Sequence, residues 1–244
     1  MAGRLIMSAS LYLLFTQGAC MRAGIIGGHA AVPHSHPYMV YLWKGVPPDG
    51  KPCEGFLVSE NYVMTAAHCD GRTITAYSGA HDVSDLSSIQ SVAVEETFPH
   101  ADFNSLYDND IMLLQLQKNI TLNKYIQSIN LPKTEDEGVP KHCLVAGWGC
   151  EDTNCTLPTP EVLKEVNVTV SDIYSDLILT DGPNGPGNGD SGGPLVCNGV
   201  AYGVVSTRRD ENETDYFFTY TRISHYLAWI NKFLNHSTQA NVYT

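Results

Sequence analysis

Three short stretches of the chain hold side chains that could work as one catalytic unit: TAAHC around His68, DNDIMLL around Asp110 and GDSGGP around Ser191. A serine hydroxyl is a poor nucleophile at neutral pH unless an imidazole takes its proton. That imidazole needs a carboxylate to fix its tautomer and stabilise its charge. Singly, each residue has an ordinary structural explanation: a structural histidine, an acid at a strand edge, a serine in a turn. Together, in the order His, Asp, Ser, they predict nucleophilic catalysis by Ser191.

Glycine and proline are concentrated around this serine, in GPNGPGNGDSGGPLVC from Gly182 to Cys197. A flexible loop is one explanation. The other is that the backbone itself approaches a reacting group, because the tetrahedral intermediate of acyl transfer needs backbone N–H donors aimed at its oxygen. A bulky side chain before Ser191 would obstruct that approach, whereas Gly189 does not. The glycines therefore indicate a catalytic role for the backbone.

The first 24 residues differ from the rest of the chain. They contain Arg4 and Arg22 but no acid, the apolar run LYLLF, and the small residues GAC that end at Cys20. This pattern predicts a secretory signal peptide over residues 1–20. An N-terminal membrane anchor is the alternative, but the apolar run is too short to span a bilayer. We expect no spanning segment elsewhere.

If the protein is secreted, its cysteines are expected to form disulfides rather than to bind metal. One of the seven falls in the leader, and the remaining even number in an oxidising compartment suggests disulfides; no CxxC pair supports a zinc site. The six are Cys53, Cys69, Cys143, Cys150, Cys155 and Cys197. Sugar acceptors of the type Asn-x-Ser/Thr fit the same route. They lie at Asn119, Asn154, Asn167, Asn212 and Asn235.

The net charge disfavours several kinds of partner. The chain carries −12, and because residues 1–24 contribute two arginines and no acid, residues 25–244 carry −14. Such a balance disfavours nucleic acid, heparin-like polymers and anionic membranes. The 244 residues, 43% of them apolar, are enough for one globular unit or two small subunits. We expect a monomer.

Short segments rich in β-branched and aromatic residues recur along the chain, such as YMVYLW from Tyr38 and FLV from Phe56. Clusters of Gly, Pro, Asn and Asp separate them, which predicts an all-β sandwich or barrel. One convincing helix lies near the C-terminal end, with Ser224 as its expected N-cap. Its apolar stripe is interpreted as core packing and comprises Ile223, Leu227, Ile230 and Leu234.

These motifs resemble the chymotrypsin-like serine protease family over nearly all of the chain after the leader. Further marks are IIGG at Ile25 and AGWG at Ala146, and the stretch IIGGHAAVPHSHPYMVYL is most similar to the granzyme, chymase and cathepsin G branch. The resemblance implies an all-β fold of two antiparallel six-stranded β-barrels with a C-terminal α-helix. The peptidase domain would be 25–244, with barrel one at about 25–132 and barrel two at about 133–244.

The resemblance also implies a role for each candidate residue. His68 would be the general base and then the general acid, Asp110 would orient it, and Ser191 would attack the peptide carbonyl. The N–H groups of Gly189 and Ser191 would form the oxyanion hole. The chemistry needs no metal or cofactor.

Activation would follow from the same resemblance. In the family, cleavage frees an α-amino group that inserts and pairs with the aspartate before the nucleophile. Here the pair would be Ile25 and Asp190, with residues 21–24 as a short propeptide. A buried carboxylate without its partner costs on the order of 3–5 kcal/mol, so we predict a zymogen. The propeptide MRAG is two dipeptides, which fits a dipeptidyl peptidase better than a trypsin-like activator.

The family pattern implies two long-range disulfides: Cys53–Cys69, which tethers the loop bearing His68, and Cys143–Cys197 across the second barrel. Cys150 and Cys155 remain, in the turn-rich GCEDTNC. We expect these two to pair with each other. Two free thiols or an intermolecular bridge are the alternatives.

One segment departs from the family. Between Val170 and Gly182 the chain is shorter than the family pattern, and the usual bridge there is missing, with Leu179 at one of its positions. A second common bridge near the substrate pocket is also absent, with Gly187 at one end; the granzyme branch lacks that bridge too. The missing segment normally packs beside the pocket, so a deformed pocket is one expected consequence.

Specificity is expected to depend on Gly185, Arg208 and Phe218. Gly185 corresponds to the base of the primary pocket, where trypsin-like members have an aspartate. Without that acid a buried cationic side chain would lack a partner, so trypsin-like cleavage is not expected. Arg208 favours acidic substrate side chains; a solvated loop is its alternative explanation. Acidic or large apolar side chains are therefore the expected substrates. The alternative is that Arg208 fills the pocket, which then accepts no side chain.

The sequence thus predicts a secreted or granule-stored serine endopeptidase that acts on proteins or peptides, with serpin-type inhibitors as candidate partners. The alternative is a catalytically weak homologue that serves as a binding or decoy protein, since the pocket segment is short. A lectin-like interaction module would leave the glycine cluster unexplained.

Overall fold

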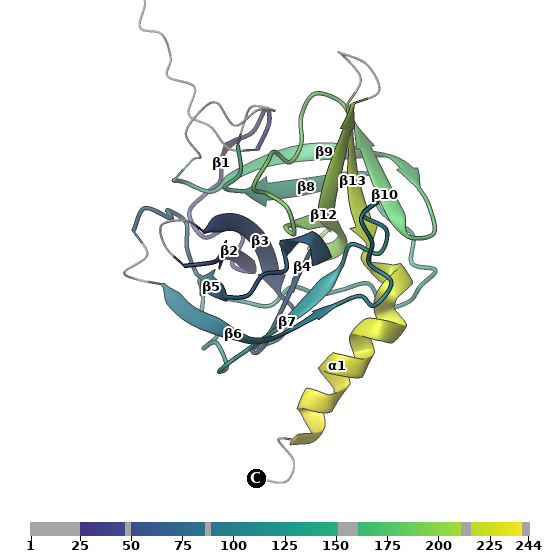
Figure 1. Cartoon of the computed structure of the whole chain (residues 1–244). Helices are drawn as coiled ribbons and strands as arrows, with labels where there is room; N and C mark the ends of the chain where they lie inside the picture. Colours follow the sequence, from purple (N-terminus) through teal and green to yellow (C-terminus); the bar gives the residue numbers. More distant parts are fainter. Residues whose placement is uncertain (1–24, 47–49, 86–88, 151–160, 211–215, 241–244) are drawn as a thin grey trace, which may run out of the picture.

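The computed structural model describes residues 25–46, 50–85, 89–150, 161–210 and 216–240. In these ranges two antiparallel β-barrels lie against each other and the chain ends in a helix (Figure 1). The predicted all-β fold of two six-stranded barrels with a C-terminal helix is confirmed.

The first barrel is closed by six strands in the order β2-β3-β4-β7-β6-β5. Alternate residues of its strands point inward: in ITAYS of β5, Ile74, Ala76 and Ser78 are buried and the residues between them are half-buried. This period of two is the one expected of a strand with one face in a core. The strands are β2 (Met39–Lys44), β3 (Lys51–Leu57), β4 (Tyr62–Thr65), β5 (Ile74–Ser78), β6 (Gln90–Pro99) and β7 (Met112–Leu116).

The second barrel has the order β9-β10-β13-β12-β11-β8 and closes through the pairing of β8 with β9. Its longer strands show the same alternation, with Val166, Val168 and Val170 of β9 buried and the residues between them exposed. The strands are β8 (His142–Gly147), β9 (Lys164–Ile173), β10 (Leu177–Asp181), β11 (Pro194–Cys197), β12 (Val200–Asp210) and β13 (Tyr216–Arg222).

The first described segment of the chain crosses to the second barrel. Its short strand β1 (His29–Ala30) pairs antiparallel with β9, where Ala30 faces Lys164. Ile25 is fully buried in the core cluster of that barrel. Although the segment precedes the strands of barrel one in sequence, it is therefore part of barrel two in space.

The C-terminal helix crosses in the opposite direction. A 3₁₀ turn, η2 (Ile223–Tyr226), leads into α1 (Leu227–Ala240), and their apolar side chains join the core of the first barrel. The ring of Phe233 lies 4.7 Å from that of Phe98 on β6. The expected N-cap is wrong: Ser224 lies inside the 3₁₀ turn, buried, and its hydroxyl has no partner among the described residues.

The shortened segment after Val170 forms a tight hairpin. Strand β9 ends at Ile173 and β10 begins at Leu177, and the N–H of Tyr174 donates to the Leu177 carbonyl at 2.8 Å. The hairpin continues the antiparallel pairing of barrel two, which closes without any longer excursion.

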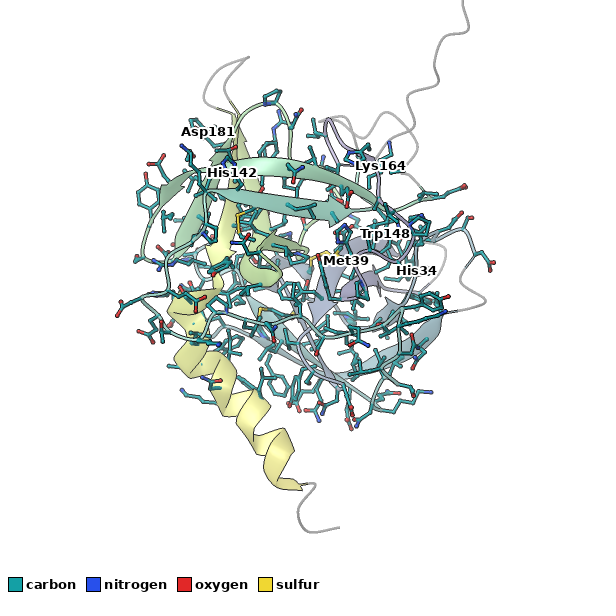
Figure 2. All side chains as sticks on the ribbon, turned by 180° about the vertical axis from the view of Figure 1, so that it is seen from behind. His34, Met39, His142, Trp148, Lys164 and Asp181 are labelled. Atoms are coloured by element: carbon teal, nitrogen blue, oxygen red, sulfur yellow. A yellow bond between two sulfur atoms is a disulfide. The ribbon has the colours of Figure 1, made fainter. Side chains whose placement is uncertain are left out.

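A small apolar cluster joins the two barrels on the face shown in Figure 2. Met39 of β2 and Trp148, just after β8, belong to this cluster together with Leu163, and all three are buried. The indole N–H of Trp148 donates to the carbonyl of His81 at 3.2 Å. The loop that follows β8 is thus held against the first barrel.

Two disulfides match the family pattern: Cys53–Cys69, which fixes the short helix η1 (Ala67–Cys69) to β3, and Cys143–Cys197 between β8 and β11. Cys150 is disulfide-bonded, and Cys155, its expected partner, lies outside the described residues. Within the described ranges, no helix combines the length and the apolar character needed to cross a membrane.

We predict that Ile230→Ala lowers the free energy of unfolding by about 2–5 kcal/mol, because Ile230 is fully buried where the helix meets barrel one. Lys232, on the exposed side of the helix, is the matched control, and Lys232→Ala should change stability by less than about 0.5 kcal/mol. Denaturant titration measures both. Equal effects would mean that the helix is not packed as described.

Candidate active site

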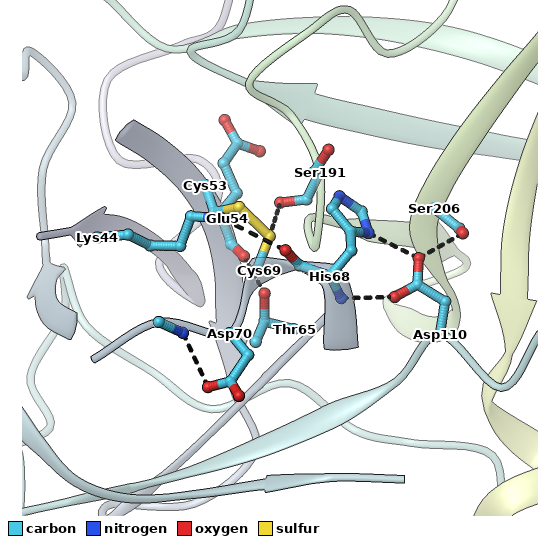
Figure 3. Close-up of a disulfide and its surroundings, with 11 residues drawn as sticks. Lys44, Cys53, Glu54, Thr65, His68, Cys69, Asp70, Asp110, Ser191 and Ser206 are labelled. Atoms are coloured by element: carbon cyan, nitrogen blue, oxygen red, sulfur yellow. Dashed lines mark hydrogen bonds and ion pairs between the residues drawn. A yellow bond between two sulfur atoms is a disulfide. The ribbon is translucent and has the colours of Figure 1, made fainter. Parts of the chain in front are cut away.

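Asp110 lies at the junction of the two barrels with its side chain fully buried. Its Oδ1 accepts the backbone N–H of His68 at 2.9 Å, and its Oδ2 accepts the His68 imidazole Nδ1–H at 2.7 Å (Figure 3). The hydroxyl of Ser206 on β12 donates to the same Oδ2 at 2.5 Å. Thr221 on β13 donates to the Asp110 carbonyl at 2.9 Å. Donors from both barrels therefore fix this carboxylate.

The pairing with Asp110 determines how His68 can act. With a proton on Nδ1 directed at the carboxylate, Nε2 is left as the basic nitrogen. Figure 3 shows the imidazole between Asp110 and Ser191. The ring of Tyr107 packs edge-on against the imidazole, with centroids 5.3 Å apart.

Ser191 is held by backbone hydrogen bonds on each side. Its carbonyl accepts the N–H of Glu54 on β3 at 2.8 Å, and the N–H of Gly192 donates to Val205 on β12 at 2.9 Å. Ser191 and His68 line one cavity of about 480 Å³. Among the described residues no hydrogen bond joins the Ser191 hydroxyl to His68. Such contacts often tighten only when substrate is bound.

Two glycines beside Ser191 are required by the backbone. Gly189 and Gly192 have φ of 104° and 86°, conformations that side chains strongly disfavour. A Cβ at Gly192 would lie 2.1 Å from Thr65 Oγ1 and 2.3 Å from the Glu54 carbonyl oxygen. The glycine-rich segment is therefore a closely packed loop, which counts against the flexible-loop explanation.

Of the three residues expected to set specificity, Arg208 and Phe218 line the cavity and Gly185 does not. Arg208 and Phe218 face each other across β12 and β13 and both line it. The ring of Phe218 lies over Gly185, since a Cβ there would be 2.6 Å from the ring. Phe218 therefore lines the cavity and covers Gly185. None of the described residues that line the cavity is acidic.

Asp190, the residue before the nucleophile, is buried with 1% of its surface exposed. Its carboxylate accepts the backbone N–H groups of Gly149 and Gly187, both at 2.6 Å. Burial raises the pKa of Asp190 to about 7, although these N–H donors lower it. Ile26 pairs with Gly185 through two backbone hydrogen bonds of 2.8 and 3.0 Å, so the segment that begins at Ile25 runs beside the Asp190 loop.

Three residues of this region were missed in the sequence. Ser206 donates to Asp110, Tyr107 packs on His68, and Glu54 lies buried beside Asp190. Glu54 alone had a visible signal, since a charged residue inside the apolar run around Phe56 is unusual. The described residues contain no group of three or more His, Cys, Asp or Glu that could hold a metal ion.

Two closed barrels with a buried Asp–His pair beside a serine in the cavity between them define a chymotrypsin-like serine protease. Residues 25–230 match the family described as Trypsin, and the chain belongs to that family.

Similar proteins include Mast cell protease 8 of Mus musculus, 41% identical, with 85% of this chain and 89% of that protein covered. Chymase of Papio hamadryas is 39% identical, with 94% and 98% covered. A solved structure described as "Structure of GrC" is 33% identical with a TM-score of 0.76, and the match covers 87% of this chain and 100% of that one. The chain is thus a serine endopeptidase with granzyme and chymase homologues.

We predict that Gly192→Ala destabilises the protein more than Gly199→Ala. Both glycines have positive φ, but a Cβ at Gly199 would meet nothing within 4 Å. Gly199→Ala therefore reports strain alone, about 1–3 kcal/mol, and Gly192→Ala adds a clash worth about 1–3 kcal/mol more. Thermal and denaturant unfolding of both variants compares them. Equal losses would contradict the close packing at Gly192.

Proposed function

We propose that the chain is a secreted or granule-stored serine endopeptidase that hydrolyses peptide bonds through His68, Asp110 and Ser191. The observation that carries the proposal is the buried Asp110–His68 hydrogen bond of 2.7 Å beside Ser191 in one cavity. Secretion is supported by the leader pattern in residues 1–20. The acidic net charge makes protein or peptide substrates better partners than nucleic acid or membranes.

The proposed mechanism follows the polarity of the site. His68 Nε2 takes the Ser191 proton as the hydroxyl oxygen bonds to the peptide carbonyl carbon, and Asp110 stabilises the imidazolium that forms. The imidazolium then gives its proton to the leaving amine as the C–N bond breaks, which leaves an acyl-enzyme. In the second half of the reaction His68 takes a proton from water as the water oxygen bonds to the acyl carbon. The ester bond to Ser191 then breaks, Ser191 regains its proton, and the carboxylic acid is released.

The oxyanion of each tetrahedral intermediate is assigned to the N–H groups of Gly189 and Ser191. A φ of 104° at Gly189 turns the backbone in a way that a side chain would oppose. Donors preorganised for the developing charge typically contribute a factor of about 10²–10³ in kcat each.

Activation is proposed to follow cleavage after Gly24. The α-ammonium freed at Ile25 would pair with Asp190, whose burial makes an opposite charge valuable. Support comes from the buried Ile25 side chain and from the pairing of Ile26 with Gly185. The uncleaved chain would then hold the Ser191 loop in a less active arrangement.

We predict that the processed chain, which begins at Ile25, is labelled stoichiometrically at Ser191 by a fluorophosphonate, because this probe reacts only with an activated serine. Uncleaved chain should react much more slowly. His68→Ala should reduce kcat by a factor of about 10³ or more, and Ser191→Ala should abolish labelling. Peptide mapping by mass spectrometry identifies the site. No labelling of correctly processed chain would favour the binding or decoy homologue instead.

The pocket is proposed to accept acidic or large apolar side chains and to reject basic ones. Arg208 and Phe218 contribute a positively charged and an apolar side chain to the cavity lining, and no described lining residue is acidic. A basic side chain would therefore be desolvated without a carboxylate partner.

We predict that substrates with Lys or Arg before the scissile bond are cleaved at least about 100-fold more slowly than the best substrate. This ratio corresponds to a cost of about 3 kcal/mol for burying the unpaired cationic side chain. Phe218→Gly should raise the relative rate for large aromatic side chains, because the ring that covers Gly185 is removed. A peptide library profiled with both forms measures this. Preferred cleavage after Lys or Arg would refute the assignment.

A further inference from the structure

Glu54, on β3 of the first barrel, is a carboxyl group in the protein interior that the proposed mechanism does not use. Only 1% of its surface is exposed. Its Oε1 accepts the backbone N–H of Trp148 at 2.5 Å, while Oε2 has no hydrogen-bond donor among the described residues. A buried carboxyl oxygen without a donor is costly, so a partner for Oε2 must be sought.

The neighbour of Glu54 is the carboxyl group of Asp190, which lies within hydrogen-bonding reach. The two meet over Gly147, where an added Cβ would lie 2.1 Å from Asp190 Oδ1 and 2.6 Å from Glu54 Oε1. An added Cβ at Gly193 would lie 2.7 Å from Glu54 Oε2. Glycines on both sides thus leave just enough room for the two carboxyl groups to face each other.

Before the Ile25 ammonium is freed, no positively charged side chain of the described residues compensates this carboxyl pair. Tyr41 on β2 and Tyr220 on β13 are the other titratable groups that interact with the pair. Burial is the main cause that raises the pKa of Tyr41 to about 12, and it also raises the pKa of Tyr220, so both side chains stay neutral. No Lys, Arg or His of the described residues acts on either carboxyl. Two buried carboxylates in contact repel strongly, so one of the pair retains a proton.

The hydrogen bonds indicate which carboxyl keeps the proton. Asp190 accepts two backbone N–H groups, which favour its charged form, whereas Glu54 accepts one. Burial raises the pKa of Glu54 well above its ordinary value, and the neighbouring Asp190 charge raises it further. A proton on Glu54 Oε2 would donate to Asp190 and satisfy the one carboxyl oxygen that lacks a partner.

Glu54 also touches the nucleophile loop directly. Its backbone N–H donates to the Ser191 carbonyl at 2.8 Å, and its carboxyl group interacts with that of Asp190. One residue of barrel one therefore contacts both the serine and the aspartate that would receive the freed amino terminus.

We propose that Glu54 is a positioning residue, protonated in the working enzyme, whose carboxyl donates a hydrogen bond to Asp190 and so holds the Ser191 loop. The freed ammonium of Ile25 then meets one carboxylate and one neutral acid, and the charges in the interior balance. When Glu54 loses its proton, two carboxylates face each other and the loop loosens. This inference rests on the proposed function for its effect on catalysis, but not for the proton itself.

The proton is tested by unfolding the full processed chain across pH, with Glu54→Gln as the main variant. Gln keeps a donor toward Asp190 and does not titrate. Because the folded-state pKa of Glu54 is raised, its contribution to stability is present below about pH 4.3, the unfolded value, and is lost as pH rises through the folded value. The melting temperatures of wild type and Glu54→Gln should therefore agree at acid pH and diverge in favour of Gln above it.

The matched control is Glu137→Gln. Glu137 is a carboxyl whose pKa is lowered by the N–H of Lys133 and the hydroxyl of Tyr202, so its removal should have the opposite pH trend. A difference between wild type and Glu54→Gln that does not change with pH would overturn the proposal.

The effect on catalysis is tested by the pH profile of kcat/KM. At acid pH the kcat/KM of Glu54→Gln should match that of wild type within about twofold, and at alkaline pH it should exceed that of wild type, because Gln keeps its donor where Glu54 has lost its proton. Glu54→Leu, which removes the donor, should be slower at every pH. Identical profiles for wild type and Gln would overturn the role in catalysis. If processed wild type is inactive, the proposed function fails, and the unfolding series still decides the proton.

Discussion

A carboxylate taken out of water must be surrounded by donors, and in this molecule that requirement joins the two barrels. Asp110 is fully buried and accepts hydrogen bonds from His68 of the first barrel and Ser206 of the second. Removing one donor from such a buried charge costs several kcal/mol, so the two barrels are held in the one arrangement that supplies them all. The position of the imidazole at the cavity is a consequence of this compensation.

Space is the second constraint, and glycine satisfies it. The segment from Gly187 to Gly193 packs against the strand ends of both barrels, and a Cβ at Gly187 would overlap the Cys150 carbonyl oxygen at 1.7 Å. With no side chains to separate them, backbone donors and buried carboxyl groups come within direct reach. The shape of the loop is fixed by this packing. The high glycine content, which suggested flexibility, is what allows the loop to pack so closely.

Much of this architecture could be predicted from the sequence, because the motifs around His68, Asp110 and Ser191 are local and resemble a family with a known fold. What could not be predicted depends on contacts between distant segments. Ser206 reaches Asp110 across 96 positions of sequence, and nothing in its neighbours marks it as a donor.

The other differences have similar causes. The N-cap at Ser224 was wrong because a 3₁₀ turn precedes the α-helix and buries the hydroxyl; helix periodicity cannot distinguish the two. The expectation for Gly185 considered only the missing acid, and the ring of Phe218 that covers it comes from another strand. The roles of the triad, the activation pair and the pocket stay predictions about chemistry, supported by the geometry of the site.

The exchange of chain ends between the barrels has a mechanical consequence. The segment from Ile25 to Ala30 is fastened to barrel two, while Ile223 and the helix that follows are fastened to barrel one. Each barrel is thus covered by a segment of chain that lies outside its own strands. Separating the two barrels would expose the apolar surface of both, because each covering segment is packed on the opposite barrel. The two crossing segments therefore resist widening of the cavity between the barrels.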